Sequence, residues 1–303
     1  MTHRGSACDD GLPPRAVVPG QLVGPRNRSD DEGRGNDQAA TSFGSVAESY
    51  DRVRPGPAPE AMDWLVPPGC GVAVDLAAGT GLFTRALLGR AARVIAVEPD
   101  TRMREVLARR SPQVDARTGY GEAMPLPDGA ADAVFVSTAW HWLDLPRAVP
   151  EIARVLRPGG RLGVIWTSRD RTDDWVAELD LLKLDGIDRP DAAATEPRTT
   201  GEVRGWLDRA HTITLPEGSP FGAGQTASFR FRRTMPLADV LNWVATNSAF
   251  ITASPVSRAA ALDRYRDVLA GRAVAGTQQD GFAAGEPVID MPMRSWCWRA
   301  ERH

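Results

Sequence analysis

Cysteine is scarce in this sequence. Among 303 residues only Cys8, Cys70 and Cys297 occur, and they lie far apart in the chain. Their spacing matches no metal-binding pattern, so the sequence predicts no metal site. An odd number of cysteines is consistent with a reducing compartment, and we therefore expect a cytoplasmic protein.

Long apolar runs and an excess of one charge are also lacking. No run approaches the roughly 20 residues that span a bilayer, and residues 1–25 contain no apolar core of the signal-peptide type. The 36 Lys and Arg against 39 Asp and Glu give a net charge of −3. This balance gives no general electrostatic footprint for nucleic acid. The expected partner is a small molecule, with no nucleic acid and no membrane span.

Residues 1–40 lack aromatic and apolar clusters and are rich in glycine, proline and charges of both signs. Such a segment cannot bury enough apolar surface to fold, which predicts a disordered tail. A tail that docks a partner is the alternative. The whole chain is nevertheless 42% hydrophobic, enough for a packed core. We expect one folded domain over residues 41–303.

The rest of the chain is arranged around residues 72–81. Val72, Val74 and Leu76 are apolar, with Ala73 between them, and predict a buried strand of a parallel sheet. Gly79 and Gly81 then turn the chain, and residues 82–88 resume with helical periodicity up to Gly89. A strand, a glycine turn and a helix N-terminus together predict a nucleotide-type cradle, with free N–H groups that favour negative charge.

The glycine pattern decides which ligand we expect. A dinucleotide fingerprint needs a third small residue, but Thr84 stands at that position. Asp75 instead lies four residues before Gly79. This spacing resembles the first motif of the class I S-adenosylmethionine (SAM) methyltransferases. The resemblance implies that Ala77, Gly79 and Gly81 lie under the methionine part of SAM and that Asp75 approaches its amino group. An ordinary turn of any doubly wound protein is the alternative.

A second acidic residue supports SAM. Residues 93–97 predict a buried strand that ends at Glu98 and Pro99, and Glu98 is 17 residues past Gly81. That spacing is close to the one expected for a ribose-binding carboxylate. We therefore expect Glu98 to accept hydrogen bonds from both ribose hydroxyls, with Pro99 beside it. Thr101 is expected to cap the helix that follows.

Residues 119–128 resemble the segment that borders the adenine in this family. Gly121 and Glu122 match the family pattern, whereas Tyr120 replaces the aspartate that usually accepts from the adenine amino group. The resemblance implies that all three lie near the base. The ring of Tyr120 could stack on the base or line its edge, and the backbone of Gly121 and Glu122 could carry the recognition.

A Trp-His-Trp sequence follows the predicted strand 132–137. Ligands bind at the carboxyl ends of such strands, so Ser137 and His141 are expected to face the transferable methyl group. His141 is our candidate catalytic residue, as a general base or a substrate partner. A structural histidine packed between two tryptophans is the alternative.

The segment that begins at Phe43 carries the string F-x-x-x-A-E-x-Y-D-R-x-R-P. It is similar to the N-terminal segment of trans-aconitate methyltransferase-like proteins. The resemblance implies that Tyr50 and Arg54 close the pocket near the methionine carboxylate or the substrate. A guanidinium suits a carboxylate through its planar fork. Packing of Tyr50 and solvation of Arg54 are the alternative.

The remaining segments complete the predicted fold, a doubly wound, Rossmann-like α/β sheet of seven strands. A SAM-binding core is expected over residues 71–167. Residues 226–235 and 287–299 predict two late strands, and helices are expected at 237–246 and 255–270. Residues 185–225 read as loop-rich. The region 168–286 would supply a substrate lid.

Together these motifs predict a SAM-dependent methyltransferase that acts on a small molecule. The subgroup resemblance favours O-methylation of a carboxylic acid, held by a cation chosen from Arg54, Arg230, Arg232 and Arg233. Methylation of a hydroxyl or a ring carbon, and a SAM-binding protein without turnover, remain alternatives. A nicotinamide dehydrogenase is disfavoured by Thr84.

Overall fold

The computed structural model describes residues 47–184, 212–247, 250–251 and 253–303. The predicted tail 1–40 and the first residues of the segment that begins at Phe43 lie outside these residues. So does most of the segment that was expected to be loop-rich. Among the residues described, no helix combines the length and apolar character needed to cross a bilayer.

One mixed sheet organises the chain, in the order β3-β2-β1-β4-β5-β8-β6, with the short β7 paired to β8. The strands are β1 Cys70–Leu76, β2 Ala91–Val97, β3 Asp115–Arg117, β4 Ala131–Ser137, β5 Leu156–Arg169, β6 Gln225–Pro236, β7 Val274–Ala275 and β8 Pro287–Glu301. The strands β1 to β5 are parallel, and β8 runs antiparallel to both β5 and β6. The predicted seven-stranded Rossmann-like sheet is therefore confirmed, with β7 as a two-residue addition.

The helices α3 Pro59–Leu65 and α4 Leu82–Leu87 cover one face of the parallel strands, and α6 Leu145–Val155 covers the other. Further described helices are α2 Ala47–Val53, α5 Thr101–Arg110, α7 Asp174–Leu184, α9 Leu237–Ala245 and α11 Pro255–Ala270. Successive strand residues point to opposite faces, so Phe135 packs with α3 and α4 while Val134 and Val136 pack with α6. These two apolar layers fix the parallel strands, and therefore the cradle at their carboxyl ends.

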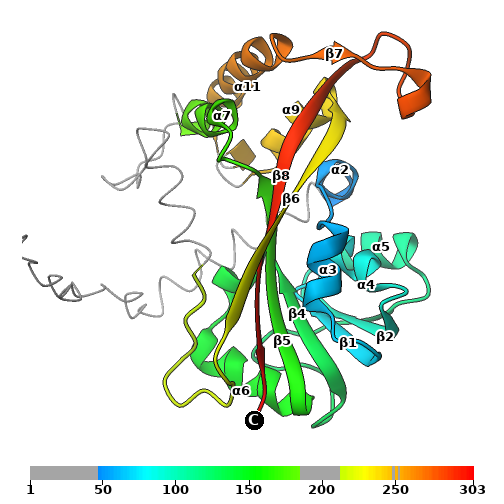
Figure 1. Cartoon of the computed structure of the whole chain (residues 1–303), viewed down its shortest axis with the longest axis vertical. Coiled ribbons are helices and arrows are strands. Elements are labelled where there is room, and N and C mark those ends of the chain that lie inside the picture. Colours follow the sequence, from blue (N-terminus) through cyan, green and yellow to red (C-terminus); the bar gives the residue numbers. More distant parts are fainter. Residues whose placement is uncertain (1–46, 185–211, 248–249, 252) are drawn as a thin grey trace, which may run out of the picture.

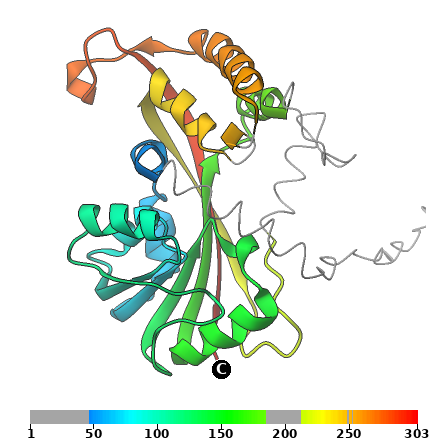
Figure 2. The ribbon, with the colours of Figure 1, turned by 180° about the vertical axis from the view of Figure 1, so that it is seen from behind.

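The strands β6 and β8 extend as a long two-stranded ribbon beyond the parallel strands (Figure 1). The helices α7, α9 and α11 gather at the far end of this ribbon, as the view from behind also shows (Figure 2). The ribbon and these helices share a second apolar core that includes Met235, Trp243, Tyr265 and Met291. The described part of the region expected to act as a lid thus consists mainly of helices packed against the ribbon of β6 and β8.

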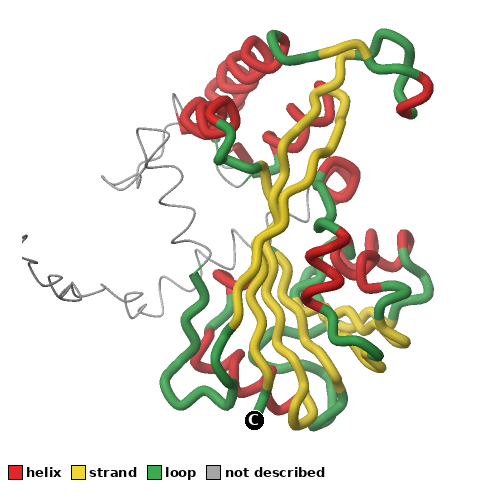
Figure 3. Tube along the Cα trace, in the orientation of Figure 1, coloured by secondary structure: helices red, strands yellow, loops and turns green. Residues whose placement is uncertain are grey.

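Hydrogen bonding sets the ends of β5 and α5. The strand β5 runs from Leu156, which pairs with Ala131 on β4, to Arg169, which pairs with Met293 on β8, and Figure 3 shows it as one long strand. Thr101 does not cap α5. Asp100 does, since its carboxylate accepts from the backbone N–H groups of Arg102 and Met103.

Candidate functional site

The glycine turn between β1 and α4 has left-handed backbone conformations, which residues with a side chain rarely adopt. Ala77, Gly79 and Gly81 have φ values of 56°, 57° and 84°. A Cβ at Gly81 would lie 2.9 Å from Leu107 Cγ, so close packing against α5 requires glycine there. A Cβ at Gly79 would meet nothing within 4 Å, so this side of the turn is open.

Three of the N–H groups that were expected to be free at the turn donate inside the protein. The N–H of Ala78 donates to Val97 O at 3.2 Å, and the N–H of Gly81 donates to Ala78 O at 3.0 Å. The N–H of Gly79 donates to Glu98 Oε2 at 2.8 Å. These amides are used inside the protein and are not available to a phosphate, which agrees with a ligand other than a dinucleotide.

Asp75 lies fully buried at the end of β1. Its Oδ2 accepts from the hydroxyl of Thr84 at 2.5 Å, whereas its Oδ1 has no hydrogen-bond partner. The pKa of Asp75 is raised to about 7 in total: burial raises it most, hydrogen bonds from Thr84 lower it, and the nearby Glu98 raises it. Thr84, which breaks the dinucleotide fingerprint, is therefore the residue that orients this carboxylate.

Glu98 follows β2 and joins the second strand to the turn. Besides Gly79, its carboxylate accepts from the N–H of Asp100 at 2.9 Å. Burial raises the pKa of Glu98, and the two backbone donors oppose this shift. The guanidinium of Arg104 donates to the carbonyls of Glu98 and Pro99 at 2.7 Å each and fixes the chain at this point.

The loop after β3 passes across the carboxyl ends of β1 and β2. A Cβ at Gly119 would lie 3.0 Å from Val97 Cγ1, and one at Gly121 would lie 3.6 Å from Leu76 Cδ2. The side chain of Tyr120 is 61% exposed. Glu122 Oε1 accepts from the N–H of Asp144 at 2.8 Å. The three predicted adenine-loop residues thus lie beside the strand ends that lead to Asp75 and Glu98.

His141 lies in a single helical turn, Trp140–Trp142, directly past β4 and Ser137. Trp140 is buried in the main core, but His141 is exposed, and its ring lies 4.6 Å from that of Trp142. The alternative of a histidine enclosed by two tryptophans is therefore wrong. The protein around the imidazole still removes part of its water, which lowers the pKa of His141.

Tyr50 and Arg54 lie on and just after α2, and they face α9. The guanidinium of Arg54 lies 4.5 Å from the centre of the Tyr50 ring. It donates to the side-chain and backbone oxygens of Thr246, each at 3.2 Å. Sequence reasoning could not foresee this contact, because Arg54 and Thr246 are 192 residues apart.

Two residues that the sequence reading missed connect α2 to the glycine turn. Arg85 on α4 donates to Thr80 O at 3.1 Å and to Asp51 Oδ1 at 2.5 Å. The Asp51 side chain is only 6% exposed and also lies 3.6 Å from Arg110 on α5. Asp51 stands inside the N-terminal string described above, so its position next to Tyr50 was the available signal.

These residues fit SAM. The cofactor carries an ammonium and a sulfonium but no phosphate. An unpartnered oxygen of Asp75 suits the ammonium, and Glu98 suits paired hydroxyls. The open side of Gly79 leaves room for a ligand against the backbone. A pyrophosphate would instead meet two acidic side chains and few free amides.

Comparisons with known proteins agree with a site for SAM. A family described as a methyltransferase domain matches residues 74–164. An uncharacterized methyltransferase of Mycobacterium tuberculosis is 42% identical over 230 residues, which cover 76% of this chain and 86% of that protein. A malonyl-acyl-carrier-protein O-methyltransferase of Methylococcus capsulatus is 33% identical over 187 residues, 54% of this chain and 62% of that protein.

Among solved structures, a candidate type II methyltransferase from Anaeromyxobacter dehalogenans has a TM-score of 0.55 and 23% identity, and covers 82% of this chain and 97% of that chain. At this identity the structural likeness supports the fold alone. The matched residues 74–164 run from β1 to β5 and so include Asp75, the glycine turn, Glu98 and His141. The chain therefore belongs to the class I methyltransferases and is an enzyme that uses S-adenosylmethionine as its methyl donor.

Proposed function

We propose that this enzyme transfers the SAM methyl group to a carboxylate oxygen of a small molecule. The observation that carries the proposal is Arg233 on β6, which is half-buried. Its only hydrogen bond among the described residues runs from Nη1 to Arg54 O at 3.4 Å. Burial lowers the pKa of Arg233 and the charge of Asp239 opposes this shift, but no carboxylate lies within ion-pair distance of Arg233 in the described part of the chain.

The other candidate arginines already have strong partners. Arg230 lies 3.0 Å from Asp170, and Arg232 lies 2.6 Å from Asp290. Arg54 is held by Thr246. Along β6 the even-numbered residues from 226 to 234 are exposed and the odd-numbered ones point inward, so Arg233 faces away from Arg232. A half-buried guanidinium that forms no close ion pair within the described residues favours an anionic ligand, which a carboxylate supplies with matching geometry.

The cofactor contacts follow from the site. We propose that Asp75 binds the SAM ammonium and that the backbone from Ala77 to Gly81 lies under its methionine part. Glu98 and Pro99 then border the ribose. The residues proposed around the base and the methyl group are Tyr120, Gly121, Glu122 and Ser137. Tyr50 and Arg54 hold α2 against α9 at the edge of this site.

The reaction requires the protein mainly to position the two reactants. The sulfonium of bound SAM supplies an already activated methyl group. A carboxylate is already a nucleophile, so the enzyme's contribution is to align it with the methyl carbon and to exclude water. Arg233 would hold the acid, and no base is needed. The relative whose name describes an O-methyltransferase is consistent with transfer to oxygen.

One observation favours a second acceptor class. His141 is exposed past β4, and no described residue is its hydrogen-bond partner. Its lowered pKa keeps the imidazole neutral near pH 7, so it is able to accept a proton. An acceptor hydroxyl or ring carbon would need such a base, whereas a carboxylate would not.

A panel of small carboxylic acids and phenols, incubated with SAM and read by product mass spectrometry, tests the proposal. We expect methyl esters. Arg233→Met should then raise the acceptor KM about tenfold or more, since a bond to a charged group contributes about 1.5–3 kcal/mol. Arg232→Met, on the opposite face of β6, is the matched control and should leave KM unchanged.

His141→Gln separates the two acceptor classes. With a carboxylate acceptor, this variant should keep kcat within a few-fold of the wild type. A methylated phenol or ring carbon, together with a loss of about 10²-fold or more in kcat for His141→Gln, would overturn the carboxylate proposal.

The bridge from Asp51 through Arg85 to the glycine turn gives another expected result. Arg85→Met should weaken binding of S-adenosylhomocysteine (SAH) about three- to tenfold, because the Thr80 carbonyl and the buried Asp51 lose their partner. Arg90→Met is the control, since Arg90 pairs with the exposed Asp63 and does not contact the turn. Equal SAH affinity in both variants by calorimetry would show that the bridge is irrelevant to the cofactor.

A further inference from the structure

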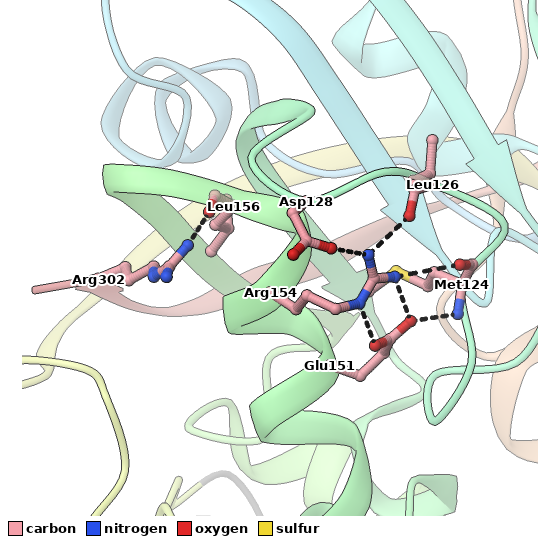
Figure 4. Close-up of polar contacts among 7 residues, drawn as sticks. All are labelled: Met124, Leu126, Asp128, Glu151, Arg154, Leu156 and Arg302. Carbon is pink, nitrogen blue, oxygen red and sulfur yellow. Dashed lines mark hydrogen bonds and ion pairs between the residues drawn. The ribbon is translucent and has the colours of Figure 1, made fainter.

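The guanidinium of Arg154, on α6, is surrounded by partners from a loop far away in sequence (Figure 4). It donates to Leu126 O at 2.9 Å, to Asp128 Oδ1 at 2.6 Å and to Met124 O at 3.4 Å. On its own helix, Arg154 forms a bidentate pair with Glu151, with both N–O distances at 2.7 Å. Among the described residues, all partners of its guanidinium outside α6 belong to residues 119–128.

Glu151 completes the arrangement. Its Oε1, which also pairs with Arg154, accepts from the N–H of Met124 at 2.7 Å. The Arg154 bond lowers the pKa of Glu151, so the pair stays charged at neutral pH. Met124 therefore has its N–H and its carbonyl held by two side chains of a single helix. Asp128 is largely exposed, and its ion pair adds little to this hold.

The loop has little regular structure of its own. Within residues 119–128 the described pairing is a single bridge between Tyr120 and Ala123. Two prolines, Pro125 and Pro127, remove backbone donors. The buried side chains of Met124 and Leu126 anchor it by packing, but packing alone does not fix the direction of backbone groups. The bonds from Arg154 and Glu151 provide that directional constraint.

This loop is placed to meet a base. Gly119 packs against Val97, the residue before Glu98, and Gly121 packs near Leu76 at the end of β1. A nucleoside whose ribose is held by Glu98 therefore has Tyr120 to Glu122 within reach. This step rests on the proposed cofactor contacts. Small displacements of backbone donors and acceptors matter there, because hydrogen bonds weaken steeply with poor angles.

We propose that Arg154 and Glu151 are positioning residues for base recognition: they hold the 119–128 loop so that its backbone reads the adenine edge of SAM. Neither residue touches the cofactor in this arrangement. They act through Met124 and Leu126, and their loss moves the loop without removing any of the groups that contact the base.

The test compares SAH with S-inosylhomocysteine, which carries an oxygen in place of the adenine amino group. Calorimetry on the full chain gives the ratio of the two dissociation constants, a measure of base selectivity. The wild type should prefer SAH. Arg154→Met should weaken SAH binding about tenfold and reduce the selectivity ratio several-fold. Arg154→Lys, which restores one charge without the fork, should recover part of the ratio.

Arg157→Met is the matched control, because Arg157 forms its ion pair with Asp132 on β4 instead. It should lower the melting temperature without changing the ratio. If Arg154→Met does not fold, Glu151→Gln replaces it, since the amide oxygen still accepts from Met124 while the ion pair is lost. An unchanged ratio in folded Arg154 or Glu151 variants would overturn the proposal. A wild type that binds neither ligand would instead overturn the cofactor contacts on which it rests.

Discussion

Glu98→Ala should weaken binding of SAM by about 10²-fold or more. A carboxylate has about four lone-pair sites. In this structure two are used by the N–H groups of Gly79 and Asp100, which leaves two for the paired hydroxyls of a ribose. Each bond to a charged acceptor contributes about 1.5–3 kcal/mol, so the loss of both gives 3–6 kcal/mol, about 10²- to 10⁴-fold. The variant also leaves the N–H of Gly79, in the glycine turn, without its acceptor.

Glu105→Ala is the control for this measurement. Glu105 is an exposed acid on α5, a few residues past Glu98, and it has no role in the turn. Its variant should bind SAM as the wild type does. Circular dichroism should show both variants folded. A folded Glu98→Ala protein with wild-type affinity would mean that the acid after β2 does not hold the ribose.

SAH binding at pH 6 should release close to one proton from the wild type and much less from Asp75→Asn. Burial raises the pKa of Asp75 to about 7, so the free protein carries a proton there at pH 6. The ammonium of the ligand favours the ionised carboxylate and expels that proton. The direction follows from the raised pKa: the ionised fraction of the free protein grows as pH rises through 7, so the release should decline from pH 6 to pH 8.

Calorimetry in two buffers of different ionisation enthalpy counts the protons. Asparagine has the size of aspartate but does not ionise. The Asp75→Asn variant therefore separates the proton released by Asp75 from any released by Glu98, whose pKa is also raised. Its SAH affinity should also fall, because a neutral amide does not attract the ammonium. The same proton release in both proteins would exclude Asp75 as the ammonium ligand.

Local sequence patterns were sufficient for the parallel half of the fold. Apolar strands that end in acidic residues, with a glycine turn between them, predicted β1, β2 and their order around the cradle. The expectation that Asp75 and the 119–128 loop border the cofactor came from the resemblance to the methyltransferase family, whereas Glu98 was expected there from its spacing after the glycine turn. The positions of these residues in the structure agree with it.

Contacts that join distant segments could not be predicted in this way. Thr84 was interpreted only as the missing third small residue of the dinucleotide fingerprint. In the structure its hydroxyl donates to the buried carboxylate of Asp75. Asp51 and Arg85 are 34 residues apart, and only packing brings α2 to α4. Arg54 was expected to be available for a carboxylate, but α9 supplies its partners. No periodicity or propensity within one window contains such pairs.

The place of β8 between β5 and β6 has a consequence for the order of assembly. Arg161 on β5 pairs with Glu301 on β8, 140 residues away, and among the described strands β6 pairs with β8 alone. Non-local pairings of this kind form slowly, because chain entropy is lost before contacts compensate for it. The strands β1 to β5 can associate as soon as residues 70–169 are synthesised. We therefore expect a nascent chain to form its cofactor cradle first. Arg233, the proposed anchor of the acceptor, reaches its place in the sheet only after β8 has paired with β5.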